Sequence, residues 1–320
     1  MKYFNNLNRW LILMILVVSA GMISCDEGKI FEEELYKKNF ALISGDDNIF
    51  TVVHDLDSVE FTGYVAASVG GTNPTETDIN VLLKQDRDLF DNYNTVRYDV
   101  DYAKYANLLS PDKYDIANYN FTIPAGGRSG RTKIVVRPEG LSPDSLYFIS
   151  LKVDNFSAYE VNPNKNDVLY SVAIENKYSL YPYSTLYAQR AVRTGVNILG
   201  TKAIHPISKN KVRIMAGIEQ FEKDTAIINR YGIVLEIDND NKVHISAFRN
   251  PGNSPAKVIV TQVDDDPDFP NIFKIENDGF KNWKTFLLRY DYKVGSTSYQ
   301  MQEELRLELK DDEKYKFLIN

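Results

Sequence analysis

Apolar and polar residues alternate along much of this chain, and clusters of Gly, Pro, Asn and Asp interrupt the alternation at short intervals. Because successive side chains of a strand point to opposite faces of a sheet, this alternation predicts half-buried β-strands joined by turns. The pattern also predicts one helix, over residues 102–109, with Asp101 as its N-terminal cap. The predicted strands lie at residues 59–65, 114–123, 133–136, 168–174, 211–216, 231–237, 242–248, 257–260, 272–275, 286–292 and 299–309.

The order and spacing of these segments predict an all-β chain with two domains. Turn-forming residues are concentrated between residues 155 and 167, which is where we place the boundary. We predict an immunoglobulin-like β-sandwich over residues 48–157 and, over residues 167–320, an antiparallel β-meander that forms a lipocalin-like barrel or a sandwich. The composition agrees, since 21 Tyr and 16 Phe favour strands. The charged segment that precedes the first domain, residues 25–47, is interpreted as a tether.

The first 24 residues have the pattern of a cleaved bacterial lipoprotein signal. Lys2 and Arg9 precede an apolar run at residues 10–18, which is too short to span a bilayer. Ser24 then stands directly before Cys25, the only cysteine of the chain. We therefore predict cleavage after residue 24 and lipid attachment to Cys25, which leaves no thiol for a disulfide. The alternative is an ordinary secretory signal followed by a chance cysteine.

The charge balance narrows the choice of partners. The chain carries 37 basic and 44 acidic residues, for a formal net charge of -7, and two of the basic residues belong to the signal. Nucleic acid is therefore excluded as a partner, because a polyanion would be repelled and no stripe of Lys and Arg compensates. For the same reason, contact with the membrane is predicted through the lipid anchor alone.

The sequence contains no recognisable catalytic set. Residues 126–130, Gly-Gly-Arg-Ser-Gly, lack the spacing of a nucleophile elbow and lie between two predicted strands, which indicates a hairpin turn. His54, His205 and His244 are far apart in the sequence and lack metal-ligand spacing. The acidic residues are so numerous that no pair stands out for glycoside hydrolysis. We predict a protein without enzymatic activity and without a cofactor.

Aromatic side chains are the best candidates for a binding site. Once Trp10 has been removed with the signal, Trp283 is the only tryptophan, and it follows a polar loop that ends at Asn282. Tyr181 and Tyr183 belong to a second, tyrosine-rich segment that Pro182 opens. Aromatic rings pack against the C–H faces of sugars, and neighbouring amides bond the hydroxyls. These four aromatic and amide residues are therefore our glycan-binding candidates; the alternative is that the rings fill the core or the interface between domains.

Acidic clusters raise the question of a calcium site. Asp264, Asp266 and Asp268 lie close together and supply the oxygen ligands that calcium prefers. Their spacing is not that of an EF-hand. Runs of Asp and Asn between strands are also common turn formers, because their side chains bond the local backbone. The three aspartates are kept as weak calcium candidates, and no other metal site is predicted.

Four segments carry a resemblance to a known family. In order, they are Asp88-Leu-Phe-Asp-Asn-Tyr93-Asn94, Leu108-Leu-Ser-Pro111-Asp-Lys-Tyr114, Phe121-Thr-Ile-Pro124-Ala-Gly126 and Tyr147-Phe-Ile-Ser-Leu-Lys-Val153. This set is similar to an N-terminal domain of unknown function in Bacteroidetes surface lipoproteins of glycan-utilisation loci, which some members carry ahead of endo-β-N-acetylglucosaminidase domains. A β-rich domain commonly follows that N-terminal domain. The C-terminal part of this chain resembles it, above all in Trp283-Lys-Thr-Phe286-Leu-Leu-Arg-Tyr-Asp-Tyr292 and Gln302-Glu-Glu-Leu305.

The resemblance implies a function but transfers no catalytic residue. The two resembling regions cover nearly all of the chain after the signal and leave no room for a catalytic module. They imply an outer-membrane lipoprotein, exposed at the cell surface, that binds glycan non-catalytically in a polysaccharide or glycoprotein-glycan uptake system, beside an outer-membrane transporter complex. The first alternative is a structural or adhesive surface lipoprotein that binds a protein partner. The second is a hydrolase, which would need two carboxylates facing each other across a cleft.

Three short triplets resemble the acceptor used in Bacteroidetes O-glycosylation, in which Asp is followed by Ser or Thr and then an apolar residue. They nominate Ser58, Ser145 and Thr225 as O-glycosylation candidates. Modification needs hydroxyls that an enzyme can reach. A structure that buries all three would therefore exclude the prediction.

Overall fold

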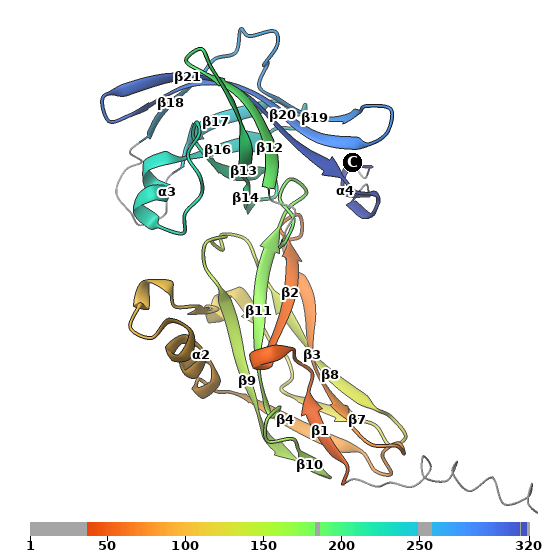
Figure 1. Cartoon of the computed structure of the whole chain (residues 1–320). Helices are drawn as coiled ribbons and strands as arrows, with labels where there is room; N and C mark the ends of the chain where they lie inside the picture. The colour runs from red at the N-terminus through yellow and green to blue at the C-terminus, as the bar shows by residue number, and fades with distance from the viewer. Residues whose placement is uncertain (1–36, 183–185, 249–257, 314, 319–320) are drawn as a thin grey trace, which may run out of the picture.

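Two layered β units follow one another along the chain and are stacked end to end (Figure 1). The structure is a computed structural model and describes residues 37–182, 186–248, 258–313 and 315–318. Sheets dominate both units, so the prediction of an all-β chain is confirmed. Among the residues that the structure describes, no helix is both long and apolar enough to cross a membrane.

The first unit is a sandwich of two sheets. Three parallel pairings, β1 with β10, β2 with β11 and β5 with β9, occur among otherwise antiparallel neighbours. One sheet has the order β10 (Glu160–Val161), β1 (Asn39–Leu42), β3 (Phe61–Val69), β8 (Ser129–Val136) and β6 (Tyr114–Asp115). The other has the order β2 (Ile49–Asp55), β11 (Asp167–Glu175), β9 (Tyr147–Phe156), β4 (Ile79–Gln85) and β7 (Asn120–Ile123), with β5 (Asn107–Leu108) beside β9.

The core of this sandwich follows from the alternation in the sequence. In β3, Val65, Ala67 and Val69 point inward, and the residues between them are more exposed. On β8, the neighbour of β3 in the same sheet, Ile134 and Val136 are fully buried. Burial of one aliphatic side chain stabilises the fold by about 1.5–3 kcal/mol. The apolar face of each strand therefore packs inward.

The end of the first unit differs from the predicted boundary. We predicted that residues 168–174 open the second domain, but β11 pairs in parallel with β2 and antiparallel with β9. It therefore fills the position between these two strands, and hydrogen bonding extends the first unit to Glu175. Alternation identifies a strand but not its neighbours, which is why the pattern did not reveal this assignment.

The second unit also has two sheets, and only one of them is a meander. The four-stranded sheet follows the chain as β14 (His205–Ser208), β15 (Lys211–Met215), β16 (Gly232–Ile237) and β17 (Val243–Ala247), all antiparallel. In the larger sheet the last strand lies between earlier ones. Its order is β13 (Val196–Ala203), β12 (Leu186–Arg193), β21 (Thr297–Leu309), β20 (Asn282–Val294) and β18 (Val258–Gln262), with β19 (Ile272–Asn277) also paired to β20.

The predicted helix over residues 102–109 is wrong. Residues Tyr102–Lys104 form only a single 3-10 turn, η3, and the strand β5 follows. The side chain of Asn94 explains this, because it accepts a hydrogen bond from the Ala106 N–H at 2.8 Å and donates one to the Ala106 carbonyl at 3.3 Å. The observed helical segments are α2 (Asp88–Tyr98), α3 (Thr225–Tyr231), α4 (Tyr315–Leu318), η2 (Asp46–Asn48), η4 (Pro111–Lys113) and η5 (Asp311–Glu313).

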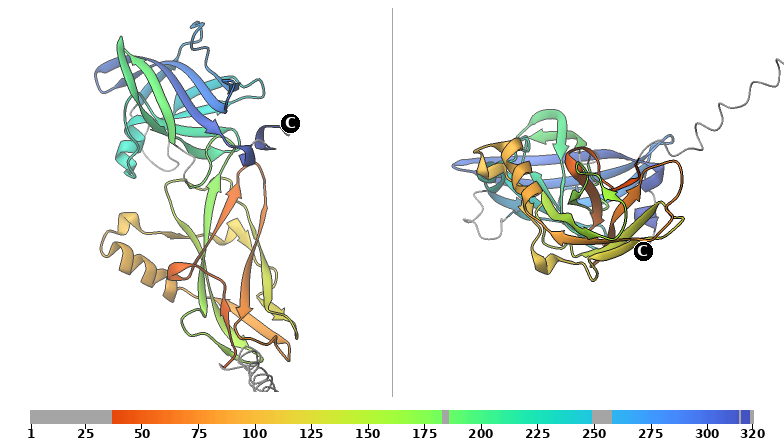
Figure 2. Two further views of the ribbon diagram at one scale, coloured as in Figure 1. Left: turned by 45° about the vertical axis from the view of Figure 1, so that its right-hand side comes forward. Right: turned by 90° about the horizontal axis from the view of Figure 1, so that it is seen from below.

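Polar contacts join the two units, and the C-terminal segment lies at their junction (Figure 2). Arg213 of β15 donates two hydrogen bonds of 2.6 Å to the carboxylate of Asp144, which precedes β9. Lys316 of α4 donates to Asp55 at 3.0 Å and also to Glu175. These contacts involve charged groups with little exposure, so they orient one unit on the other.

Candidate functional site

Trp283 and Asn282 are tied to neighbouring side chains. The Trp283 indole N–H donates to the Asp278 carboxylate at 2.7 Å, and the Arg306 guanidinium lies 4.3 Å from the centre of the indole ring. The side-chain oxygen Oδ1 of Asn282 accepts a hydrogen bond from the side-chain amide of Asn277 at 2.9 Å. One face of the indole is therefore covered by Arg306, which leaves less ring surface for a sugar than the sequence suggested.

Acidification is expected to release Trp283 from Asp278. The backbone N–H groups of Lys281 and Phe280, and then the Trp283 indole, hold the pKa of Asp278 at about 2, below its ordinary value of 3.8. A lowered pKa means that the interaction is present above pH 3.8 and is lost as the pH falls toward 2. In a protein without residues 1–24, Trp283 is the only tryptophan, so its fluorescence should change over this range. An Asp278→Asn variant should lack the transition; an identical transition in that variant would contradict the assignment.

Tyr181 lies at the junction of the two units, apart from Trp283. It is exposed, and its backbone N–H donates to the Glu175 carboxylate at 3.1 Å. It lines a cavity of about 200 Å³ whose wall does not include Trp283, while Tyr183 lies outside the described residues. The structure therefore does not bring the tyrosine and tryptophan candidates into one site. The cavity is lined by Ser142, Pro143, Ser145, Leu146, Tyr147, Ser171, Val172, Ala173, Ile174, Ser179, Leu180, Tyr181, Pro182, His205 and Pro206.

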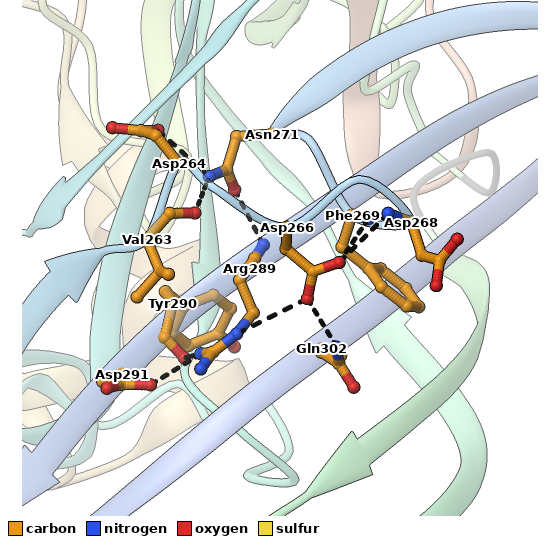
Figure 3. Close-up of polar contacts among 10 residues, drawn as sticks. All are labelled: Val263, Asp264, Asp266, Asp268, Phe269, Asn271, Arg289, Tyr290, Asp291 and Gln302. Carbon is orange, nitrogen blue, oxygen red and sulfur yellow. Dashed lines mark hydrogen bonds and ion pairs between the residues drawn. The ribbon is translucent and has the colours of Figure 1, made fainter.

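The three calcium candidates do not face a common point: Asp264 and Asp266 bond protein donors, and the Asp268 carboxylate points away from both (Figure 3). Asp266 accepts from the backbone N–H groups of Asp268 and Phe269 at 3.0 and 3.1 Å and lies 3.8 Å from the Arg289 guanidinium. Its other oxygen accepts a hydrogen bond from the Gln302 amide, which is the main cause of its lowered pKa.

The remaining candidate, Asp264, accepts from the Asn271 amide at 3.3 Å. In the part of the chain that the structure describes, no group of three metal-binding side chains is found. The carboxylates of Asp264 and Asp266 hold a loop across the outer face of the large sheet, which is the turn-forming role considered as the alternative.

The O-glycosylation candidates are not all buried. Ser58 and Thr225 are exposed, and Ser145 is half-buried in the wall of the cavity between the units. The exposure that modification requires is thus met at two of the three positions, and the modification itself stays a prediction. Cys25 lies outside the described residues.

A groove on the first unit was not foreseen from the sequence. It lies between η2 and the helix α2, which flanks β9 and β11 (Figure 1), and has a volume of about 370 Å³. Asp47 and Asn48 form its edge with backbone φ angles of 53° and 56°, a left-handed conformation that Asp and Asn tolerate best. The Asn48 amide holds this turn by donating to Asp167 at 2.6 Å. The groove is lined by Asp47, Asn48, Leu89, Asn92, Tyr93, Val96 and Arg97.

The walls of this groove combine an aromatic ring with polar groups. The Tyr93 ring packs against Phe148 at 5.1 Å, and burial raises the pKa of Tyr93 to about 12, so its hydroxyl stays protonated at neutral pH. The Arg97 guanidinium lies 6.0 Å from the same ring. Within the described ranges, no hydrogen-bond or ion-pair partner is found for the side chains of Asp47 and Asn92. A carboxylate, an amide and a guanidinium are therefore available to a ligand beside one ring.

Further tyrosines continue from the groove along the end of α2. The ring centres of Tyr93 and Tyr98 are 6.2 Å apart, those of Tyr98 and Tyr105 are 6.2 Å apart, and those of Tyr105 and Tyr102 are 5.1 Å apart. Tyr105 is fixed by a 2.6 Å hydrogen bond from its hydroxyl to the Asp99 carbonyl. Tyr102 is 72% exposed, so this series of rings reaches the surface.

The sequence contained a signal for this groove in the segment Asp88–Asn94. Two of its residues, Phe90 and Asn94, are buried and structural, since Phe90 packs on Phe148 and Asn94 bonds Ala106. Asn92 lies between them in the sequence but lines the groove, as does Tyr93. The segment thus carries both the residues that hold α2 on the sheet and two of the residues that line the groove.

Comparison with known proteins identifies the class to which this two-unit β protein belongs. A family model described as an N-terminal domain matches residues 36–160, and one described as a C-terminal domain matches residues 166–306. The second match includes β11, although hydrogen bonding places that strand in the first unit. The chain belongs to this two-domain family, which confirms the resemblance found in the sequence. No match was found among curated proteins.

Solved structures from Bacteroides share this fold. A protein of unknown function from Bacteroides ovatus is 18% identical, with a TM-score of 0.61 over 87% of this chain and 93% of that chain. A multidomain protein including DUF1735 from the same species is 14% identical, with a TM-score of 0.59 over 85% and 95% of the two chains. An auxiliary nutrient binding protein from Bacteroides thetaiotaomicron is also 14% identical, with a TM-score of 0.54 over 83% and 92%.

Proposed function

We propose that this protein is a lipid-anchored protein of the outer membrane that binds glycan without hydrolysing it, in a polysaccharide or glycoprotein-glycan uptake system. The observation that carries the proposal is the groove between η2 and α2, where free polar groups surround the Tyr93 ring. The nutrient-binding protein that shares this fold supports the same class of function. A transporter complex in the same membrane would receive the bound glycan.

The groove supplies the contacts by which proteins hold a pyranose. The C–H face of a sugar packs on the Tyr93 ring, as apolar surfaces do on aromatic side chains. Asn92 can donate to and accept from hydroxyls, Asp47 accepts and Arg97 donates. Each of these groups makes its bonds to the ligand without breaking a bond within the protein. The series of tyrosines beyond Tyr93 offers further rings to a longer chain of sugars.

The absence of hydrolysis is supported by the acid groups. Asp47 is the only carboxylate among the residues that line the groove, whereas glycoside hydrolysis needs two. A general acid also needs a raised pKa. Among the described residues, each carboxyl with a resolved shift has a lowered pKa, namely Asp112, Asp238, Asp266, Glu276 and Asp278.

Substitutions in the groove test the site directly. Asn92→Ala and Asp47→Asn should each weaken glycan binding by about tenfold, because each removes one hydrogen bond or charge from the ligand. Asparagine at position 47 keeps the left-handed turn possible. The matched control is Asn197→Ala, on the exposed surface of β13 in the other unit, which should bind like the unchanged protein. Titration calorimetry measures all three.

The binding candidates nominated from the sequence, Trp283 and Tyr181, provide the test that could contradict this site. Trp283→Ala and Tyr181→Ala should retain binding, since neither residue lines the groove. Loss of binding in one of these variants, with full binding in Asn92→Ala and Asp47→Asn, would move the site away from α2.

The lipid anchor is a separate part of the proposal. The predicted tether, residues 25–47, was drawn too long, because β1 (Asn39–Leu42) already pairs with β3 in the first sandwich. Cleavage after residue 24 and acylation of Cys25 would place the charged residues that precede β1 next to the membrane and the two β units beyond them. Cells should incorporate labelled fatty acid into the unchanged protein and not into Cys25→Ala. Protease added to intact cells should degrade the anchored protein if it is exposed at the surface; protection from protease would place it in the periplasm.

A protein partner is the second candidate function, and the edge strand β13 favours it. Leu199 and Val196 on this strand are 81% and 59% exposed, and β13 pairs with β12 on one side only. An apolar edge strand is a surface to which another chain can add. If no glycan binds, a structural or adhesive role through this edge becomes the better account.

A further inference from the structure

A second cavity, of about 250 Å³, lies in the second unit and is formed by five segments of the chain. They are the residues after β11, the turn between β14 and β15, the turn between β16 and β17, the strand β19 and the short helix α4. It is separate from the groove on α2, which belongs to the first unit. Its wall consists of Lys177, Tyr178, Lys209, Asn210, Ile237, Asp238, Asn239, Asn241, Phe273, Lys274, Ile275 and Phe317.

Three lysines lie around this cavity in a chain that is acidic as a whole. Lys274 is paired with Glu276. Lys177 contacts rings instead of carboxylates, with its ammonium 5.2 Å from the Tyr178 ring centre and 5.7 Å from that of Phe317. Lys209 is exposed, and over the described ranges neither it nor Lys177 forms an ion pair with a carboxylate. Two ammonium groups are therefore available to a ligand.

The one carboxylate in the wall, Asp238, is engaged elsewhere. One of its oxygens accepts from the backbone N–H groups of Asp240 and Lys242 at 2.9 Å each. The other lies 3.0 Å from the His244 ring nitrogen, and this contact is the largest cause of its lowered pKa. Asp238 therefore stabilises the turn to which it belongs, and it does not pair with the lysines of the cavity.

Buried aromatic rings lie beneath the cavity. Tyr178 and Phe273 are 2% and 4% exposed, and their rings meet edge to face at 4.9 Å. Phe317 stacks on Phe273 at 5.9 Å. The apolar surface that a ligand can reach comes from Ile275, which is 41% exposed, and from the half-buried Phe317. The exposed side chain of Asn239 adds a neutral donor and acceptor there.

We propose that this cavity binds a small organic anion that carries a carboxylate or sulfate group, such as an acidic sugar. Lys177 and Lys209 bond the charged group, Asn239 bonds a neighbouring hydroxyl, and the carbon skeleton packs on Ile275 and Phe317. The chemistry follows from two ammonium groups without carboxylate partners beside a small apolar surface. The proposal does not depend on the α2 groove, because the two sites lie in different units and share no residue.

Titration calorimetry of the full chain after the signal, with glucuronate, inorganic sulfate and glucose as probes, tests the proposal. Glucuronate should bind, sulfate should bind more weakly because it has no carbon skeleton, and glucose should not bind at this site. Lys177→Gln and Lys209→Gln should each weaken glucuronate binding by about tenfold. The control is Lys133→Gln, because Lys133 is an exposed residue of β8 in the first unit and loses the same charge. This variant should bind glucuronate with unaltered affinity.

Other outcomes of the same titrations would contradict the proposed anion site. Glucuronate binding that survives both lysine substitutions would overturn the site, as would glucose binding that the same two substitutions weaken to the same extent. Sulfate that binds as tightly as glucuronate would overturn the organic ligand and assign the cavity to inorganic anions. Equal melting temperatures for the variants and the unchanged protein ensure that a loss of affinity reports the site and not the fold.

Discussion

Glu303→Ala is expected to lower the free energy of unfolding of the second unit by about 3–5 kcal/mol, because it leaves a buried ammonium without its counter-charge. Glu303 of β21 and Lys202 of β13 are 0% and 1% exposed, and their charged atoms lie 3.5 Å apart. The carboxylate also accepts hydrogen bonds from the Tyr290 hydroxyl at 2.9 Å and the Gln189 amide at 2.5 Å. All of these groups lie inside the sandwich, where water cannot replace Glu303.

Urea unfolding measures this loss, and the neighbouring residue provides the control. Glu304→Ala removes the same charge from the opposite, half-exposed face of β21 and should cost less than about 1 kcal/mol. The double variant Lys202→Met with Glu303→Leu should recover most of the loss, because it removes both charges together. A loss in Glu303→Ala no larger than in Glu304→Ala would show that the buried pair does not stabilise the fold.

Asp144→Ala is expected to have an effect of similar size, about 3–5 kcal/mol, at the junction of the two units. Its partner Arg213 is 0% exposed and donates both of its hydrogen bonds to this one carboxylate. The guanidinium also lies between two rings, 4.9 Å from Phe248 and 5.5 Å from Phe221. Without Asp144, the positive charge stays among apolar groups that cannot solvate it.

Thermal and urea unfolding test this junction. The control is Glu60→Ala, which removes the exposed pair of Glu60 with Arg137 at 3.0 Å and should cost less than about 1 kcal/mol. In Asp144→Ala we also expect the two units to unfold in separate transitions, because their strongest polar contact is gone. A variant that keeps a single transition and the stability of the control would contradict the role of this pair.

Strands were predictable from this sequence because alternation is a local property. β3, β16 and β21 lie where the pattern of apolar residues placed strands, within a few residues at each end. Pairing is not local. β11 looks like any other alternating strand, and only its hydrogen bonds to β2 and β9 assign it to the first unit. The helix α2 was missed because a buried Asn94 occupies a position where the helical pattern expects an apolar residue.

The candidate site was harder to predict than the fold. Trp283 was a reasonable choice by residue type, but Arg306, on the neighbouring strand β21, covers part of its ring. The groove depends on Asp47 and Asn92, which are distant in sequence and meet because η2 packs near α2. The spacing of residues along the sequence does not reveal that these two side chains lie close together. The family segment at residues 88–94 lies on α2, and the structure shows which of its side chains line the groove.

Titration of the protein without its signal against a panel of glycans, followed by chromatography of the recovered sugar, tests the central proposal most directly. At least one glycan is expected to bind, Asn92→Ala and Asp47→Asn should each weaken its binding by about tenfold, and the sugar should be recovered uncleaved. Cleaved sugar would contradict binding without hydrolysis. Binding that both substitutions leave unchanged would contradict the groove on α2 as the site.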